Sequence, residues 1–453
     1  MVLSAWWLLL IAVPVLLLGE QLVRRIPALS RVDMPVPVVG GFVIAVAFLV
    51  WNLFGTRGIE WLRSPAPSIP IYLPLSTAFF TCVGLNASWS VARRGSWLLL
   101  ILLSVATVLA VLQNLVGVGL ARSLGVSPYV GLLCGSVTLT GGPSTAIGFS
   151  ESFKEAGFAD AAVVGTAAAM FGIVTGSLLG GTLGGLLIRR HRFKTSAEAA
   201  ATAPAENGSA RRALFAQSAP TPALAMAGIG PNPIVHGAAP RDQASSFEPP
   251  PNRLPRGFVN QVRALIELGP SALVHLAILL ACMKLGAWVS WELRSLGAKF
   301  PVYMGAMLVG ITVRNLLDAG GAKILSTYAI NLIGSVTLAL FLAIAMSSLN
   351  LLQLRTLAAP MLVILLVQVG LMLAFAWLVT FNLMGRDYEA AVASAGHVGF
   401  GLGITPNAVA TMDVLTAKFG AAPRAFLCVT IVGAFLIDFT NALTITGWMN
   451  WLK

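Results

Sequence analysis

One acidic residue stands in the middle of a long apolar stretch of this sequence. Asp438 lies in the segment AFLIDFTNAL (434–443), and Asn441 follows it three residues later. Helical positions i and i+3 share a face, so the two side chains could offer oxygen atoms to one cation. A carboxylate in such surroundings is costly and usually faces a cavity or a partner. The alternative is a hydrogen-bonded Asp438 that ties this span to its own hairpin.

Two further apolar stretches, about 128–150 and 389–415, are crowded with Gly, Pro, Ser and Thr. Residues 135–148 read GSVTLTGGPSTAIG, and residues 395–412 read AGHVGFGLGITPNAVATM. Pro removes a helical hydrogen-bond donor and Gly weakens a helix interior, so both stretches predict interrupted helices. The N–H groups at the start of a half-helix can hold a carboxylate, and nearby carbonyl groups can coordinate Na⁺. A kinked helix packed through its small residues is the alternative.

The predicted binding site for a small anionic substrate lies at these two interruptions. Its residues are Thr140, Gly141, Gly142, Ser144, Thr145, Thr405 and Asn407, with His397 near the start of the second stretch. For the four side chains of Ser144, Thr145, Thr405 and Asn407, the alternative is capping of the local backbone. His397 could bind substrate or carry a proton, or it could be a capping or packing histidine near the inner surface.

The predicted sodium ligands are Asn86, Asp438 and Asn441. Asn86 lies in VGLNAS (83–88), at the end of an apolar span, whereas Asn114 in LQN (112–114) is better explained by hydrogen bonding between helices. The four cysteines stand singly, which favours neither a metal site nor a disulfide framework. HExxH, GxSxG, P-loop and dinucleotide motifs are absent from the sequence, so neither an enzyme nor an ATP-driven pump is expected. We expect no cofactor beyond Na⁺ as coupling ion.

The elements that must position these residues are apolar spans. Of 453 residues, 57% are hydrophobic and only 10% are charged, against about 25% in a soluble domain. Ten spans are long enough to cross a hydrocarbon core of about 30 Å: 4–22, 36–54, 71–90, 96–121, 161–188, 266–291, 301–317, 326–349, 356–384 and 424–448. The fold class is therefore an all-α polytopic membrane protein. The first span lacks the basic start and cleavage site of a signal peptide, so we expect it to be retained.

The chain reads as two copies of one unit. At an offset of 263, Pro143 matches Pro406 and Gly157 matches Gly420; at 264, Pro37, Gly41, Phe171 and Ser177 match Pro301, Gly305, Phe435 and Asn441. Residues 195–262 between the copies are rich in Ala, Pro and polar residues and predict a flexible linker. We therefore predict a first membrane repeat over 1–194 and a second over 263–453.

The positive charges predict the orientation of these repeats. The net charge of +12 gathers at the ends of spans and not on one polar face, which argues against nucleic acid as a partner. If the basic residues after the first, third and fifth spans are cytoplasmic, the linker is cytoplasmic and both termini lie outside. Five crossings per copy give the repeats opposite orientations, and the two interruptions become re-entrant hairpins opening to opposite faces. Such inverted repeats are typical of secondary transporters; a symmetric channel is the alternative.

Several of these segments resemble the bacterial sodium/glutamate symporter family. The likeness covers most of both halves and fails in the linker. It is carried by MPVPVVGG (34–41), AFFTCVGLNA (78–87), LQN with VGVG (112–119), GSVTLTGG (135–142), AGHVGFGLGITPNA (395–408) and VGAFLIDFTNAL (432–443). The family's first hairpin usually reads Gly-Gly-His-Gly-Thr, whereas this chain has Gly-Gly-Pro-Ser-Thr at 141–145, and Asn407 stands where Thr is typical.

The resemblance implies a homodimer in the bacterial inner membrane that imports glutamate or a related small carboxylate with Na⁺. It also implies an elevator-like motion of a hairpin-bearing core against a dimerising scaffold. The altered first hairpin leaves the identity of the carboxylate open. Three other functions stay open at this point: a proton-coupled carrier of another organic anion using Asp438 or His397, a passive channel or exporter, and a membrane-embedded enzyme.

Overall fold

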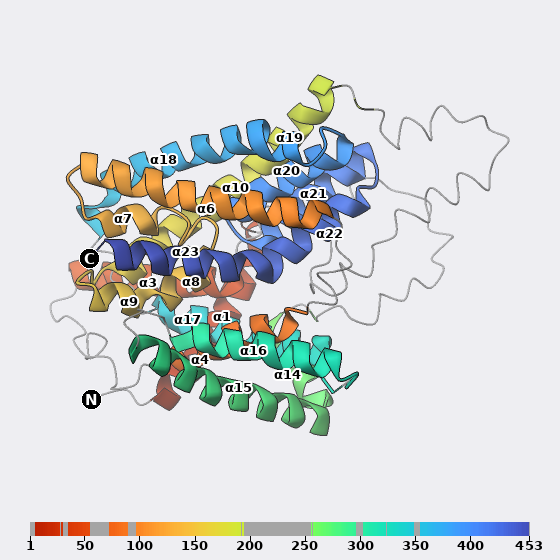
Figure 1. Ribbon diagram of the computed structural model, residues 1–453. Coiled ribbons are helices and arrows are strands. Elements are labelled where there is room, and N and C mark those ends of the chain that lie inside the picture. The colour runs from red at the N-terminus through yellow and green to blue at the C-terminus, as the bar shows by residue number, and fades with distance from the viewer. Residues whose placement is uncertain are drawn as a thin grey trace.

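The computed structural model describes residues 5–27, 29, 35–54, 72–88, 97–191, 193, 255, 257–295, 302–322, 324–347 and 354–452. All regular structure within these ranges is helical (Figure 1). Helices occupy each of the ten ranges predicted as apolar spans, so the all-helical prediction is confirmed. The predicted linker 195–262 lies outside the described residues except at its end, where a helix already begins at Phe258.

The helices form two groups. In Figure 1 most of the first group lies below the second, with α15 at its outer edge. We call this first group the lower body: it consists of α1 (Ala5–Arg25), α3 (Val36–Phe54), α4 (Tyr72–Asn86), α14 (Phe258–Glu267), α15 (Pro270–Ser295), α16 (Val302–Ala319) and α17 (Thr327–Ser347). Both halves of the chain contribute to it.

The second group, the upper body, also draws on both halves. It consists of α6 (Trp97–Ser123), α7 (Pro128–Leu133), α8 (Gly142–Gly148), α9 (Ser150–Glu155), α10 (Ala161–His191), α18 (Ala358–Phe375), the π-helical turn η3 (Ala376–Thr380), α19 (Phe381–Leu383), α20 (Tyr388–Gly401), α21 (Thr405–Phe419), α22 (Pro423–Ile431), the π-helical turn η4 (Val432–Leu436) and α23 (Ile437–Trp451). π-Helical turns are rare and frequently lie at functional sites. Both of them here adjoin predicted site residues.

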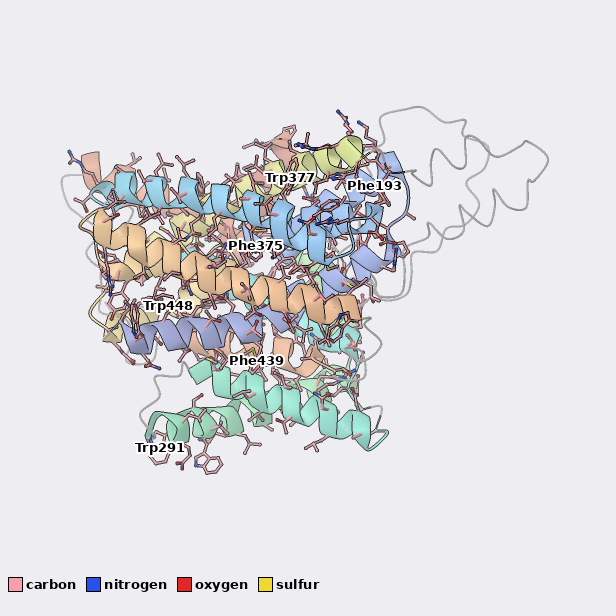
Figure 2. All side chains as sticks on the ribbon, turned by 45° about the horizontal axis from the view of Figure 1, so that its top comes forward. Phe193, Trp291, Phe375, Trp377, Phe439 and Trp448 are labelled. Carbon is pink, nitrogen blue, oxygen red and sulfur yellow. The ribbon has the colours of Figure 1, made fainter. Side chains whose placement is uncertain are left out.

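Several helices are suited to a lipid environment. Among the described residues, five are long and apolar enough to cross a membrane: Trp97–Ser123, Ala161–His191, Pro270–Leu293, Thr327–Ser347 and Ala358–Leu383. A sixth span results if Pro423–Ala434 and Ile437–Trp451, which meet at a bend of 42°, count as one. Figure 2 shows Trp291 at the outer edge of α15, where its side chain is 64% exposed. Large apolar side chains on the outside are expected where the surroundings are lipid.

A stripe of glycines joins α10 to the second interrupted segment. Gly172, Gly176, Gly180 and Gly184 recur every four residues and face α20 and α21. A methyl group added at Gly172 would lie 2.1 Å from the carbonyl oxygen of Leu402, and one at Gly180 would lie 2.9 Å from that of Ala395. Small residues let helix backbones approach this closely.

Both predicted interruptions are present. The helix α7 ends at Leu133, and the chain runs through turns to α8, which begins at Gly142. The helix α20 ends at Gly401, and α21 begins at Thr405. A methyl added at Gly399 would lie 2.5 Å from the Cα atom of Ala408, so α21 folds back against α20 as a helical hairpin.

Candidate functional site

The two interruptions meet inside the upper body. A methyl added at Gly142 would lie 2.8 Å from Cγ2 of Ile404 and 3.6 Å from the carbonyl oxygen of Gly403. Gly142 has a φ of +70°, which glycine adopts without strain. The start of α8 and the start of α21 are therefore in contact, although they lie in different halves of the chain.

The first interruption is almost completely enclosed. Every residue from 130 to 150 is buried except Ser144, which keeps partial exposure at the start of α8. The N–H groups of Gly141 and Gly142 donate to the carbonyl oxygens of Ser136 (3.0 Å) and Thr138 (2.9 Å). These two N–H groups are therefore engaged within the turn, and Thr145 is buried against Gly141. Ser144 is the predicted site residue most open to a ligand here.

The second interruption is more open. Ile404 and Thr405 are partly exposed and Pro406 is exposed. The Thr405 hydroxyl donates to the carbonyl oxygen of Gly433, in η4, at 2.5 Å. Asn407 is buried; its Nδ2 donates to the carbonyl oxygen of Ile173 at 2.9 Å, while its Oδ1 has no partner. Thr405 thus lies at the opening, and Asn407 fastens α21 to α10.

Asp438 lies about one helical turn after Gly433, whose carbonyl oxygen bonds Thr405. It follows η4 on α23, at the bend between α22 and α23, and no described residue donates a hydrogen bond to it. It lies within electrostatic range of Tyr303 of α16, whose buried hydroxyl is also without a hydrogen bond. The Tyr303 ring stacks on Phe80 with centroids 4.1 Å apart and meets the edge of Phe149. Asp438 of the upper body therefore lies near Tyr303 of the lower body.

Asn441, the second predicted sodium ligand, holds the first interruption. Its Nδ2 donates to the carbonyl oxygen of Ser136 at 2.9 Å, and the N–H of Ser136 donates to Oδ1 of Asn114 at 3.0 Å. Three polar atoms in this group have no partner: Asn114 Nδ2, Ser136 Oγ and Asn441 Oδ1. Buried polar atoms are normally satisfied, so an unpaired oxygen of this kind is available to a water molecule or a cation. No described group of three or more His, Cys, Asp or Glu side chains is arranged to hold a metal ion.

Two predicted residues lie apart from the meeting point. Asn86 belongs to the lower body, where its Nδ2 donates to Oδ1 of Asn331 on α17 at 2.7 Å. His397 is fully buried in α20, and its Nδ1 lies 2.8 Å from the Thr380 hydroxyl in η3. Its ring packs against Phe375 and Phe400, and Nε2 has no partner. Of the proposed sodium ligands, Asp438 and Asn441 share α23, whereas Asn86 makes its contact elsewhere.

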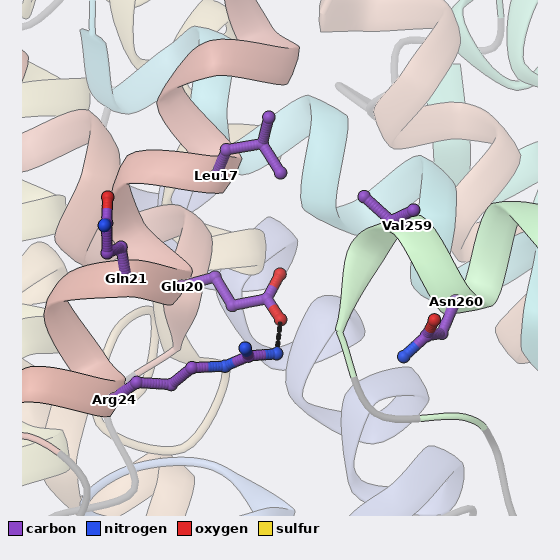
Figure 3. Close-up of a pocket in the computed structure, with 6 residues that line it drawn as sticks. All are labelled: Leu17, Glu20, Gln21, Arg24, Val259 and Asn260. Atoms are coloured by element: carbon purple, nitrogen blue, oxygen red, sulfur yellow. Dashed lines mark hydrogen bonds and ion pairs between the residues drawn. The ribbon is translucent and has the colours of Figure 1, made fainter.

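Sequence reasoning missed Gln113, which contacts both interruptions, and Tyr303, which faces Asp438. A buried amide within the apolar run of α6 was a signal that could have identified Gln113. Nothing in the sequence marks Tyr303, because its importance comes from the partners that surround it. A separate pocket of about 430 Å³, lined by Leu17, Glu20, Gln21, Arg24, Val259 and Asn260, lies between α1 and α14 and contains no predicted site residue (Figure 3).

Comparison with known proteins decides the family. The family model described as sodium/glutamate symporter matches residues 1–218 and 256–421. The chain belongs to the sodium/glutamate symporter family. The sodium/glutamate symporter of Escherichia coli (strain K12) is 36% identical over 433 residues, which cover 95% of this chain and 93% of that one. That of Haemophilus influenzae is 33% identical over 440 residues, covering 97% and 95%.

Membership of the sodium/glutamate symporter family confirms two expectations from the sequence. The resemblance seen in the motifs is correct, and the chain is a multi-pass membrane transporter and not an enzyme. One solved structure, a sodium–proton antiporter from Methanocaldococcus jannaschii at pH 8, matches over 98% of both chains with 13% identity and a TM-score of 0.38. So distant a likeness carries no argument about this fold.

Proposed function

We propose that this chain is a secondary-active symporter that imports glutamate or a related small carboxylate together with Na⁺. The observation that carries this proposal is family membership across both halves of the chain, since relatives named as sodium/glutamate symporters match almost end to end. The meeting of two interrupted helices supports it, because two half-helix starts that keep the polar side chains of Ser144 and Thr405 partly exposed suit a carboxylate.

The substrate site of this proposal lies where α8 and α21 begin. Ser144 and Thr405 keep exposure there and are the side chains that would contact the carboxylate or amino group. Five more predicted site residues support the starts of the two helices without being exposed themselves: Thr140, Gly141, Gly142, Thr145 and Asn407. His397 lies further from the site, within α20. Pro143 and Pro406 each occupy the second position of their helix, where a missing N–H leaves no broken hydrogen bond.

The sodium site of this proposal centres on Asp438. Its carboxylate has no hydrogen-bond donor among the described residues, and Asn441 on the same helix has an unpaired Oδ1. Asn86 would become a third ligand only if the lower body moved closer to Asp438 and Asn441, because Asn86 is bonded to Asn331 in this structure. An unpaired Asp438 beside the Tyr303 hydroxyl also favours one second candidate, a proton-coupled carrier of an organic anion.

Transport in this proposal proceeds by alternating access, with the upper body moving as an elevator against the lower one. The Thr446 hydroxyl contacts Sδ of Met304 at 3.6 Å and Asp438 lies within electrostatic range of Tyr303, so α23 and α16 would form the sliding surface. The equivalent places of Pro143 and Pro406 support two inverted repeats with re-entrant hairpins. A homodimer in the bacterial inner membrane, with a cytoplasmic linker and both termini outside, completes the proposal.

Uptake into proteoliposomes tests the function. Purified protein is supplied with labelled glutamate, aspartate or other carboxylates, with and without an inward Na⁺ gradient. Accumulation of one of them that requires Na⁺ is expected. If no carboxylate accumulates under Na⁺, the symporter proposal is wrong; steep pH dependence without Na⁺ dependence would favour the proton-coupled carrier.

Asp438→Asn tests the sodium site. Loss of a charge-assisted contact costs about 1.5–3 kcal/mol, so the half-activating Na⁺ concentration should rise about tenfold or more. Asp413→Asn, a second acid in the same half of the chain, is the control and should change it less than about twofold. Equal effects of the two substitutions would contradict the assignment.

A further inference from the structure

The side chain of Gln113 joins the two interruptions. Gln113 is fully buried in α6. Its Oε1 accepts a hydrogen bond from the Thr140 hydroxyl at 2.8 Å, and its Nε2 donates to the carbonyl oxygen of Gly401 at 3.0 Å. Thr140 lies two residues before α8, and Gly401 is the last residue of α20. One amide therefore contacts both halves of the chain beside the proposed substrate site.

The direction of each bond is fixed by its partner. A main-chain carbonyl can only accept, so Nε2 of Gln113 must face Gly401 and Oε1 must face Thr140. The carbonyl of Gly401 lies at the C-terminal end of a helix, where the backbone supplies no donor from a following turn. Gln113 supplies the missing donor. The donor and the acceptor of the Gln113 amide therefore each have a partner, one in each interrupted segment.

The position of Gln113 is itself held from outside the interruptions. Nε2 of Gln368, on α18, donates to the main-chain carbonyl oxygen of Gln113 at 2.6 Å. The next residue, Asn114, accepts from the N–H of Ser136. The position of the Gln113 side chain, which bonds Thr140 and Gly401, is thus fixed by contacts of two long helices, α6 and α18. A network in which each member bonds to the next is stiffer than separate contacts.

We propose that Gln113 is a positioning residue that sets the two helix starts relative to each other, so that they present their groups to the cargo as one unit. The inference rests on the proposed function in taking these starts as the substrate site. Removing the amide would leave the Thr140 hydroxyl and the Gly401 carbonyl buried without their partner, at about 1–3 kcal/mol for each unsatisfied group. The two starts would then shift independently.

Hydrogen–deuterium exchange of the full chain in lipid nanodiscs tests the joining role without any transport assay. Gln113→Leu should speed exchange by about tenfold in both segments, 135–145 and 400–408. Thr140→Val removes only one of the two bonds and should affect 135–145 alone. Thr107→Val is the matched control: Thr107 also lies on α6 and bonds the Thr440 hydroxyl at 3.0 Å, away from the interruptions. It should change neither segment.

Transport kinetics supply the second measurement. In Gln113→Leu, both the KM for glutamate and the half-activating Na⁺ concentration should rise about tenfold, while the maximal rate changes less than about twofold. If Gln113→Leu folds poorly, the shorter amide of Gln113→Asn and the one-sided Thr140→Val variant carry the same exchange comparison.

Exchange that changes in only one segment of Gln113→Leu, in neither, or equally in Thr107→Val would overturn the proposal. An unchanged KM with a reduced maximal rate would overturn it as well. A wild-type protein that accumulates no carboxylate under Na⁺ would contradict the proposed function but leave the exchange result to decide the role of Gln113.

Discussion

The two interrupted segments match each other in sequence but are held in different ways. The first is gripped by side chains: Asn114 and Asn441 bond the N–H and the carbonyl of Ser136. The second is held by close backbone contact, where α10 presents glycines to α20 and α21, together with the buried amide of Asn407, which donates to the carbonyl oxygen of Ile173. We therefore expect the first segment to be most sensitive to the loss of a polar group and the second to be most sensitive to the addition of an apolar one.

The second segment is also held by ion pairs near the start of α20, and the described contacts include no such ion pairs for the first segment. Arg424, at the start of α22, pairs with Asp387 at 3.3 Å and with Glu389 at 3.5 Å. Glu389 also accepts from the N–H of Ala425 at 2.7 Å. These charged groups lie near the surface, whereas the hydrogen bonds to Ser136 are buried. Three substitutions separate these three kinds of attachment.

Adding a methyl to the glycine stripe should have the largest effect. In Gly172→Ala the new Cβ would lie 2.1 Å from the Leu402 carbonyl oxygen, and a backbone atom cannot rotate away. We expect the free energy of unfolding to fall by about 3 kcal/mol and transport to be lost. Thermal unfolding of the purified protein and uptake measure the two effects.

Gly181→Ala is the control for this substitution. A methyl there would lie 3.9 Å from Cγ2 of Thr411, and alanine favours a helix interior over glycine by about 0.8–1.0 kcal/mol. The variant should be as stable as the parent or more stable. A Gly172→Ala protein that matched it would show that the second segment is not held by backbone contact.

Removing a buried hydrogen bond to the first segment should have an intermediate effect on stability. Asn114→Ala leaves the buried N–H of Ser136 without its acceptor, which costs about 1–3 kcal/mol of unfolding free energy. Ser123→Ala on the same helix removes only an exposed bond to the carbonyl of Leu120 and serves as the control. Equal melting temperatures for the two variants would count against side-chain anchoring of the first segment.

Breaking the surface fastening should have the smallest effect. Arg424 is 60% exposed, and exposed ion pairs contribute less than about 1 kcal/mol. Arg424→Gln should keep transport within about twofold of the parent, and the remaining difference should fade as salt is raised. A loss as large as that of Asn114→Ala would contradict the ranking of this exposed ion pair below the buried hydrogen bonds.

The sequence predicted the helices and the two interruptions, because apolar length and the Gly and Pro content are local properties. Pro143 and Pro406, which match at an offset of 263, each occupy the second position of their helix. The site was predicted less completely. Asn86 bonds Asn331, which is 245 residues away, and His397 bonds Thr380 in a π-helical turn. Such contacts depend on how helices pack, and no local pattern encodes their partners.

The glycines of α10 also determine how the interface responds to its surroundings. A glycine has no side-chain rotamers to freeze, so packing against it sacrifices no side-chain entropy. The attraction between the touching backbones is dispersion, which persists in lipid, where apolar surfaces gain nothing by leaving water. The hold of α10 on α20 and α21 is therefore enthalpic in origin, and bilayer composition should alter it little.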